Sequence, residues 1–591
     1  MQRLLRSSIV LIVLATISAC GGGAIRVSGS SATGGVTPLG TVLDVSDLDG
    51  ATSVPVETTF RHIFDENVDH QTINTNSFFI APTSSAGSSL SKAASDFALG
   101  DILASTVSIS SDSNYTYYLD PADFLDEATL YTVCLTDNID LSSGNPFSET
   151  CVTFMTESSV CLAKTDGDIN CDGYPDLVVG APLSEERKGK IDIYYGSSDG
   201  IGAFAGATFL GENDNESIGF TTAIGDVNGD KFEDIIVGAP YYEDDEIGTG
   251  GSDKVYIYFG SSDLSEKTTP DVTLSAYDGD TGFGNVIGSG DFNNDGYDDI
   301  LIGAQDTSST VYTGSAYLFY GSESISDSST PHTTYSTSDY LGSAIAVGDF
   351  NGDGVDDAVI GAEDYPSTYG HPGRAYLYTG STTGGLSKSP SLTFIGSSSG
   401  EHMGTDAASG DLNGDGYDDI IIGAEQYRLD ENPSEWAGRC YVFFGGADVD
   451  ATADFILQAD SEQSLGSNVA SGNLNGDEYQ DLIVGALDYQ DSRGAVYVIY
   501  GASSLSGETT NADLLLTGEN IDDAFGEALA TGDLNGDGYL ETIIGAPGYN
   551  SYTGRVYVLD GSSDGLIQPP SLIIDSEISE VLLGASLGST N

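Results

Sequence analysis

An acidic loop of fixed spacing is the part of the sequence with the clearest chemical potential. One copy lies in GDLNGDGYDDIIIGAEQ, where Asp411, Asn413, Asp415 and Asp419 occupy relative positions 1, 3, 5 and 9 and a glycine occupies position 6. Hard cations such as Ca²⁺ bind roughly six to eight oxygen ligands. Alternate residues of a tight turn can direct oxygens inward, and glycine permits the sharp bend. The pattern therefore predicts a calcium loop ligated by these four side chains and by a backbone carbonyl at position 7.

The loop occurs seven times in register. Its copies begin 58, 65, 58, 62, 62 and 60 residues apart. The predicted calcium ligands are Asp168, Asn170, Asp172, Asp176, Asp226, Asn228, Asp230, Asp234, Asp291, Asn293, Asp295, Asp299, Asp349, Asn351, Asp353, Asp357, Asp411, Asn413, Asp415, Asp419, Asn473, Asn475, Asp477, Asp481, Asp533, Asn535, Asp537 and Glu541. These residue types also favour ordinary turns. Three carboxylates in one nine-residue turn repel one another without a counter-ion, however, so we expect up to seven Ca²⁺ ions.

Individual loops depart from the pattern. Position 6 is Lys231 in the second loop and Glu478 in the sixth, and the sixth also begins with Asn473, so we expect the sixth to be the weakest site. Position 12, which carries a bidentate Glu in helix–loop–helix calcium sites, is an apolar-flanked Gly423 in the fifth loop. The absence of helical periodicity favours a loop in a β-hairpin.

Strands must position these loops. In six of the seven copies an apolar residue and a glycine precede the loop by about seven residues, as at Gly404, and in every copy Gly-Ala follows twelve residues after the start of the loop, as at Gly423. A glycine and a Tyr-bearing strand come next, as in GRAYLYTG. Each unit therefore predicts a strand, the acidic loop, a strand, a turn and a third strand, with room for a fourth.

The order of the units predicts a closed ring. The first loop lacks the upstream strand, whereas VLLGASLGSTN at the C-terminus supplies a strand without a loop. Pairing this strand with the first unit would close a seven-bladed β-propeller over 160–591 and leave no long exposed sheet edge. The strand-like VCLAKTD at 160–166 is the alternative for that place.

These motifs resemble FG-GAP repeats. The resemblance rests on IGFTTAIGDVNGDKFEDIIVGAP, which joins the apolar-Gly strand, the acidic loop and the GAP turn. FG-GAP repeats form the N-terminal propeller of integrin α subunits. The resemblance implies a calcium-stabilised adhesion or recognition propeller, with ligand contacts on the face opposite the calcium loops.

The N-terminus is typical of an exported protein. Residues 1–19 combine Arg3 and Arg6 with an apolar stretch, which predicts a signal peptide. ISAC, ending in Cys20, resembles a bacterial lipobox, which implies cleavage before Cys20, its lipidation and anchoring to a membrane. The alternative is an ordinary signal peptide with an incidental cysteine. We expect a Gly/Ser-rich tether at 20–36 and a lipoprotein of the outer membrane or cell surface.

A separate all-β unit is expected at 37–157. Strand-like segments at 58–64, 76–81 and 129–135 predict a β-sandwich. The unit resembles the bacterial Ig-like domains of surface proteins, which mostly act as spacers.

The cysteines suit an oxidising compartment. We expect disulfides between Cys134 and Cys151 on neighbouring sandwich strands, and between Cys161 and Cys171 around the first loop. Cys440 takes the place of small apolar residues in other repeats, which predicts a buried, inert thiol.

Composition limits the function. With 18 Lys and Arg against 91 Asp and Glu, the net charge of −73 excludes nucleic acid as a natural partner. We expect a non-catalytic, surface-anchored module for an extracellular protein or glycan, with specificity in a divergent inter-blade loop at 426–436. The alternatives are a propeller enzyme acting on polysaccharide, such as a glycosidase or lyase, and a purely structural envelope protein. Five histidines without a metal-binding pair, and no nucleophile motif, argue against the enzyme.

Overall fold

The computed structural model has two compact units, Met1–Val160 and Cys161–Asn591. The first is described by its strands, and the second over residues 165–240, 253–275, 282–305, 314–337, 340–363, 372–429 and 432–588, apart from isolated positions. The predicted signal peptide at 1–19, Cys20 and the tether at 20–36 lie outside the described residues. None of the described helices is both long and apolar enough to cross a membrane.

The first unit contains two sheets, with strand orders β1-β2-β5-β4 and β3-β6-β7. The strands are β1 (Val42–Asp44), β2 (Thr59–Ile63), β3 (Phe78–Pro82), β4 (Ser105–Ile109), β5 (Thr116–Pro121), β6 (Leu130–Leu135) and β7 (Thr150–Met155). Strands β2, β3 and β6 confirm the three strands predicted at 58–64, 76–81 and 129–135. The two sheets fit the predicted sandwich.

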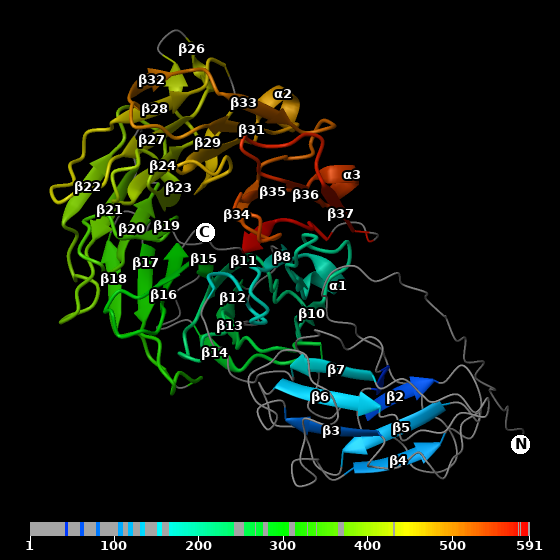
Figure 1. Ribbon diagram of the computed structural model, residues 1–591. Coiled ribbons are helices and arrows are strands. Elements are labelled where there is room, and N and C mark those ends of the chain that lie inside the picture. The colour runs from blue at the N-terminus through cyan, green and yellow to red at the C-terminus, as the bar shows by residue number, and fades with distance from the viewer. Residues whose placement is uncertain are drawn as a thin grey trace, which may run out of the picture. The chain divides into compact units, whose positions relative to one another are not determined.

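The second unit is a seven-bladed β-propeller, whose sheets are arranged around a central axis in Figure 1. The first strands of blades 1 to 7 are β38 (Ser586–Gly588), β11 (Thr221–Gly225), β15 (Phe283–Gly290), β19 (Ile345–Gly348), β23 (Met403–Gly410), β29 (Leu465–Gly472) and β34 (Ala528–Gly532). The second strands are β8 (Leu177–Ala181), β12 (Asp234–Ala239), β16 (Asp299–Gln305), β20 (Asp357–Ala362), β24 (Asp419–Ala424), β30 (Asp481–Ala486) and β35 (Glu541–Ala546). The third strands are β9 (Lys190–Tyr194), β13 (Lys254–Tyr258), β17 (Gly314–Phe319), β21 (Arg374–Tyr378), β27 (Arg439–Phe443), β31 (Ala495–Ile499) and β36 (Arg555–Leu559). The fourth strands are β10 (Ala207–Leu210), β14 (Val272–Ser275), β18 (Thr333–Thr337), β22 (Leu392–Ile395), β28 (Phe455–Gln458), β33 (Leu514–Thr517) and β37 (Leu572–Asp575).

Burial explains the composition of the strands. Every residue of β24 is buried, because each second strand has a neighbouring blade on both of its faces, and its sequence is a continuous apolar run after the first residue. The outer strand β10 instead alternates buried and exposed residues. The sequence pattern therefore distinguishes inner strands, which are continuous apolar runs, from outer strands, in which buried and exposed residues alternate.

The apolar core lies between the blades. Ile421 of blade 5, for example, shares a buried cluster with Val484 and Tyr497 of blade 6. Where the ring closes, another buried cluster joins Ile543 of blade 7 to Leu177 and Val179 of blade 1. The ring is thus held together by side chains that adjacent blades share.

Two glycines of the repeat meet at each blade boundary. Gly423 on β24 lies so close to the carbonyl group of Gly466 in the next blade that a Cβ on Gly423 would overlap it, and Gly466 itself has φ +88°. The pairs are Gly180 with Gly219, Gly238 with Gly284, Gly303 with Gly342, Gly361 with Gly404, Gly423 with Gly466, Gly485 with Gly526, and Gly545 with Gly584. Close approach on one side and a left-handed backbone on the other account for both glycine positions.

The C-terminal strand closes the ring, as predicted. Strand β38 pairs with β8 in antiparallel register, with Ser586 opposite Gly180 and Gly588 opposite Val178. The amide of Gly584 also donates a hydrogen bond to the carbonyl of Gly180 at 3.0 Å. The place beside β8 therefore belongs to β38 and not to the segment at 160–166.

The divergent segment at 426–436 was wrongly assigned to an inter-blade loop. It contains β25 (Arg428–Leu429) and β26 (Asn432–Trp436), which pair as a hairpin between β24 and β27 of the same blade. Short helical turns occupy the equivalent connection in three other blades, namely α1 (Ser184–Arg187), α2 (Tyr489–Ser492) and α3 (Tyr549–Tyr552). The sequence of the segment, QYRLDENPSEW, is mostly polar, and a single sequence does not distinguish such a hairpin from a loop.

Candidate calcium loops

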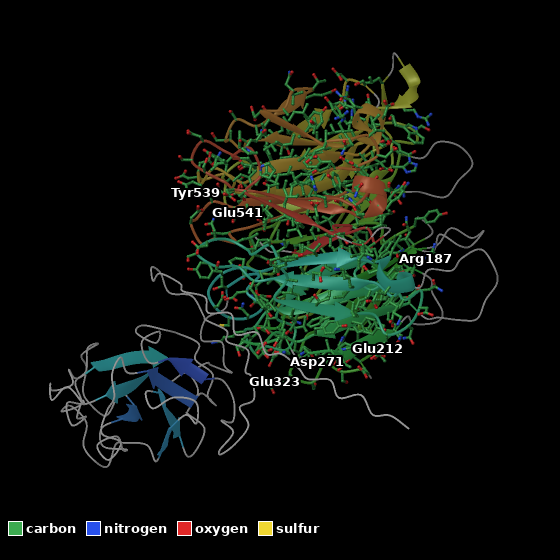
Figure 2. All side chains as sticks on the ribbon, turned by 90° about the vertical axis from the view of Figure 1, so that its right-hand side faces the viewer. Arg187, Glu212, Asp271, Glu323, Tyr539 and Glu541 are labelled. Atoms are coloured by element: carbon green, nitrogen blue, oxygen red, sulfur yellow. The ribbon has the colours of Figure 1, made fainter. Side chains whose placement is uncertain are left out.

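All seven acidic loops lie on one face of the propeller. In blades 2 to 7 the loop joins the first strand to the second, so that Gly410 pairs with Asp419 and the eight intervening residues form the turn. In Figure 2 the seventh-loop residues Tyr539 and Glu541 lie on one side of the ring, and Arg187 of the connection between β8 and β9 lies on the other. We call the first side the loop face and the second the opposite face.

The carboxylate at position 1 folds the loop around itself. In the fifth loop, Oδ1 of Asp411 accepts hydrogen bonds from the amides of Gly414 at 2.7 Å and Asp415 at 3.0 Å. Oδ2 accepts the amide of Gly416 at 2.9 Å. Glycine at position 6 has φ +88° there, and Lys231 adopts φ +74° at the same position of the second loop. The loop geometry thus tolerates a residue that the sequence pattern marks as a departure.

The residue at position 9 is buried in every loop, with an exposed fraction of 0 to 2%. In the fifth loop, Oδ2 of Asp419 accepts the amide of Leu412 at 2.9 Å, and Oδ1 accepts the amide of Gly445 at 2.9 Å. Gly445 follows β27, so this carboxylate ties the loop to the next hairpin of its own blade. Position 9 therefore has a structural role whether or not it also binds an ion.

Burial raises the pKa of the position 9 carboxyl groups. The pKa rises to about 8 for Asp299 and to about 7 for Asp357 and Asp419, mainly through loss of hydration. The charges at positions 1 and 5 of the same loop raise it further. Burial and the nearby Asp560 raise the pKa of Glu541 to about 8. A nearby cation would favour the charged form of each group.

The amide at position 3 partly occupies the centre of the loop. Nδ2 of Asn351 donates to Oδ2 of Asp357 at 2.8 Å, and Nδ2 of Asn535 donates to Oε1 of Glu541 at 2.8 Å. This donor offsets some of the negative charge that a cation would neutralise. For the amide to become a ligand, its oxygen must turn toward the carboxylates.

The sixth loop differs from the others in its first residue. Oδ1 of Asn473 accepts the amide of Gly476 at 2.7 Å, while Nδ2 donates to the carbonyl of Asp477 at 2.6 Å. The amide nitrogen thus takes a place where the other loops present a second carboxylate oxygen. This supports the prediction of a weak sixth site on physical grounds.

The residues fit Ca²⁺ by the chemistry of their donors. Each loop offers only oxygen ligands, with three carboxylates and one amide in six loops and two of each in the sixth, which is the kind of set that Ca²⁺ prefers. Within the part of the chain that the structure describes, no three carboxylate, histidine or cysteine side chains converge into a metal-holding group. In the structure, backbone amides and the side-chain amide at position 3 donate hydrogen bonds to the carboxylates. Calcium binding at these residues therefore stays a prediction.

The side chains at positions 7 and 8, which were not among the predicted ligands, connect neighbouring loops. The ring of Tyr417, at position 7 of the fifth loop, covers Gly352 at position 4 of the fourth so closely that a Cβ there would overlap the ring. Oδ2 of Asp418, at position 8, accepts the amide of Asp349 of the fourth loop at 3.0 Å. Positions 4 and 7 vary together between adjacent loops, and that pattern could have indicated the contact.

The family models match both parts of the chain. The FG-GAP repeat model matches residues 219–258, 403–443, 465–499 and 525–559, and the FG-GAP-like repeat model matches 168–237 and 291–360. The propeller is built of FG-GAP repeats. The bacterial Ig-like domain model matches residues 36–156, in the first unit.

Relatives of the FG-GAP propeller include integrin subunits and a phospholipase. Integrin alpha-5 of Xenopus laevis is 31% identical over 229 residues, which cover 36% of this chain and 21% of the integrin. Integrin alpha pat-2 of Caenorhabditis briggsae is 31% identical over 263 residues, which cover 40% of this chain and 21% of that integrin. Phosphatidylinositol-glycan-specific phospholipase D of Homo sapiens is 28% identical over 410 residues, which cover 59% of this chain and 46% of the phospholipase. The chain spans less than half the length of each of these relatives.

The described cysteines are in contrasting states. Cys171, at position 4 of the first FG-GAP loop, is disulfide-bonded, and its predicted partner Cys161 lies outside the described residues. Cys134 and Cys151 are opposite each other in the register of β6 and β7, while their predicted disulfide stays a prediction. Cys440 is a free cysteine and fully buried, and burial raises its pKa well above the usual range, as expected for an inert thiol.

Proposed function

We propose that this protein is a calcium-stabilised FG-GAP propeller that recognises an extracellular protein or glycan at the cell surface without converting it chemically. The observation that carries the proposal is the repetition of one oxygen-rich loop at the same end of all seven blades. A reaction needs one asymmetric site, whereas a repeated donor set is suited to several equivalent ions. The integrin relatives support adhesion or recognition as the purpose of the ring.

The opposite face offers the better surface for a ligand. A depression of about 420 Å³ lies there between residues 520–523 and α3 of blade 7. Ile521 and Tyr552 line it with exposed fractions of 56% and 55%. Exposed apolar and aromatic groups beside Asp522 and Asn550 suit a protein side chain or a sugar ring. Ions on the loop face would leave this surface free.

Attachment to the membrane is proposed to come from the N-terminus. A lipid on Cys20, followed by the tether at 20–36 and the Ig-like unit, would hold the propeller at the cell surface. The Ig-like domain then acts as a spacer. Metabolic labelling with a fatty acid tests this point, and a Cys20→Ala variant should lose the label.

An enzyme acting on polysaccharide is the alternative. A pocket of about 360 Å³ on the loop face is lined by Asp537, Glu541 and Asp560, and paired carboxylates can catalyse glycoside cleavage. We favour recognition because Glu541 is position 9 of a repeat and its oxygens accept hydrogen bonds from Leu534 and Asn535 of the same loop. Release of reducing ends from polysaccharides that is lost in Glu541→Gln would favour the enzyme.

The test of the proposed function is a calcium titration of the chelator-treated full chain. Calorimetry should count about five to seven sites, and the melting temperature of the propeller should rise with free Ca²⁺. Arrays of glycans and matrix proteins, probed with and without Ca²⁺, then identify the ligand. No bound calcium and an unchanged melting temperature would refute the calcium part of the proposal.

A further inference from the structure

The loop face carries a circular set of contacts from each loop to the loop of the next blade. Five glycines at position 4 are each covered by the tyrosine at position 7 of the following loop. The pairs are Gly229 with Tyr297, Gly352 with Tyr417, Gly414 with Tyr479, Gly476 with Tyr539, and Gly536 with Tyr174. The last pair joins the seventh loop to the first, so the contacts run across the point where the ring closes.

The two remaining boundaries show that the pair is a matched unit. Position 4 is Cys171 in the first loop and Asn294 in the third, and the following loops have Phe232 and Val355 at position 7. Nδ2 of Asn294 instead donates to the carbonyl of Gly354 in the fourth loop at 3.0 Å. Tyrosine thus occurs where the neighbour has a glycine and is absent where the neighbour has a side chain.

Hydrogen bonds reinforce the contact at the first predicted ligand of the second, third and fourth loops. Asp298 of the third loop accepts the amide of Asp226 of the second at 2.8 Å, and its own amide donates to the carbonyl of Asp226 at 2.9 Å. Asp356 accepts the amide of Asp291 at 2.8 Å in the same way. At these boundaries the aspartate at position 8 therefore holds the backbone of a residue that the neighbouring loop would use as a ligand.

Positions 7 and 8 belong to two loops at once. In its own loop, Tyr417 supplies the backbone carbonyl expected as a ligand, and Asp418 directly precedes the ligand Asp419. In the fourth loop, the same two residues cover Gly352 and hold Asp349. Ordering one loop therefore orders part of its neighbour, and a second ordering event then costs less conformational entropy.

We propose that Tyr417, Asp418 and the equivalent tyrosines and aspartates of other loops are positioning residues that couple adjacent loops, so that calcium affinity at a loop that receives these contacts depends on the loop of the following blade. This inference rests on the proposed calcium binding and adds its cooperativity. The contacts are local and run one way around the ring, because each loop receives them from one neighbour, whereas the coupling between two adjacent calcium sites is reciprocal. Tyr174 makes the set circular by acting on the seventh loop.

The test counts calcium ions bound to the full chain by equilibrium dialysis, at a free concentration that just saturates the wild type. Tyr417→Ala should weaken the fourth site about a hundredfold and so lose close to one ion, whereas Tyr417→Phe, which keeps the ring, should lose none. Asp349→Asn removes the fourth site directly. Combining Tyr417→Ala with Asp349→Asn should therefore lose no further ion, while combining it with Asp168→Asn, in the distant first loop, should lose one more.

The outcomes separate this inference from the calcium proposal itself. A wild type that binds no calcium overturns both. Full calcium binding by Tyr417→Ala, or an equal further loss in both double variants, overturns the coupling alone. If Tyr417→Ala does not fold, Asp418→Ala serves in its place, because it removes only the acceptor for the Asp349 amide, and the same counts are expected.

Discussion

Single carboxylates in the loops differ in what they do for the fold. Asp419 is buried and accepts amides from Leu412 and Gly445, whereas Asp415 is exposed and accepts an amide only from Tyr417. Both were predicted as calcium ligands from the same pattern. The structure separates them, because removing a buried acceptor leaves its donors unpaired.

Asp419→Ala should destabilise the protein by about 2–4 kcal/mol even in chelator, since the buried amide of Leu412 and the half-buried amide of Gly445 lose their acceptor. Asp415→Ala should change stability little in chelator and should reduce stabilisation only when calcium is present. Denaturant unfolding with and without Ca²⁺ measures both. Equal destabilisation of the two variants in chelator would contradict the structural role of position 9.

The raised pKa values predict a pH dependence in the absence of calcium. Asp299 and Glu541 have a pKa of about 8 in the folded protein, far above the ordinary values of 3.8 and 4.5. Between pH 4 and pH 8 the folded state therefore holds more protons than the unfolded state, so the free energy of unfolding falls as pH rises. Chelator-treated protein should melt at a lower temperature at pH 8 than at pH 5, and saturating Ca²⁺ should remove or reverse this trend.

Residue types and spacing indicated which side chains could be calcium ligands, which stays a prediction, but not the hydrogen bonds that these side chains make in the structure. Within one repeat, nothing indicates that Asn351 donates to Asp357, because both side chains were expected to face an ion. The contacts of Tyr417 and Asp418 were missed for another reason. They join residues more than 60 positions apart, and only a comparison of adjacent repeats connects them.

At the level of strands, alternation and apolar runs predicted the blades well. The apolar run of β24 and the Tyr-bearing β27 were both expected from periodicity, and the two strands pair in antiparallel register although the hairpin of β25 and β26 lies between them in the chain. The parallel pairing of β32 (Gly507–Thr509) with β28 was not expected. It joins a loop of blade 6 to the edge of blade 5, and its polar sequence carries no strand signal.

The glycine on the second strand gives a prediction for the elements. Gly423→Ala should cost about 1–3 kcal/mol or more, because the new Cβ meets the backbone of Gly466 and the two blades must move apart. Gly202→Ala is the matched control, since the nearest atom to its added Cβ is 3.9 Å away. Thermal melting of both variants tests this. An unchanged melting temperature for Gly423→Ala would mean that the two blades can move apart at little cost.

At the level of the whole molecule, closure was predictable from an orphan strand at one end and a missing strand at the other. What the sequence did not reveal is how many separate contacts meet at the closure. Strand β38 pairs with β8, Leu583 joins the core between blades 7 and 1, and Gly584 packs against Gly545. All of them depend on residues far apart in the chain.

Removal of residues 581–588 should therefore open the ring. The variant loses the partner of β8 and takes Val581 and Leu583 from a shared core cluster. We expect a lower melting temperature and concentration-dependent association through the exposed edge of β8. Light scattering and melting curves measure both effects, and a stable monomer would show that the remaining cluster suffices.

Because β38 pairs with β8, the ring does not depend on which blade the chain starts in. Because both ends of the ring lie in one sheet, a short linker could join residue 588 to residue 165, and new ends could be cut in an exposed connection such as 446–453. Such a circular permutant would keep every blade boundary and every loop contact. The chain of the permutant would start in a different blade. If the permutant bound calcium as the wild type does, calcium binding would depend on the arrangement of the blades in space and not on their order in the chain.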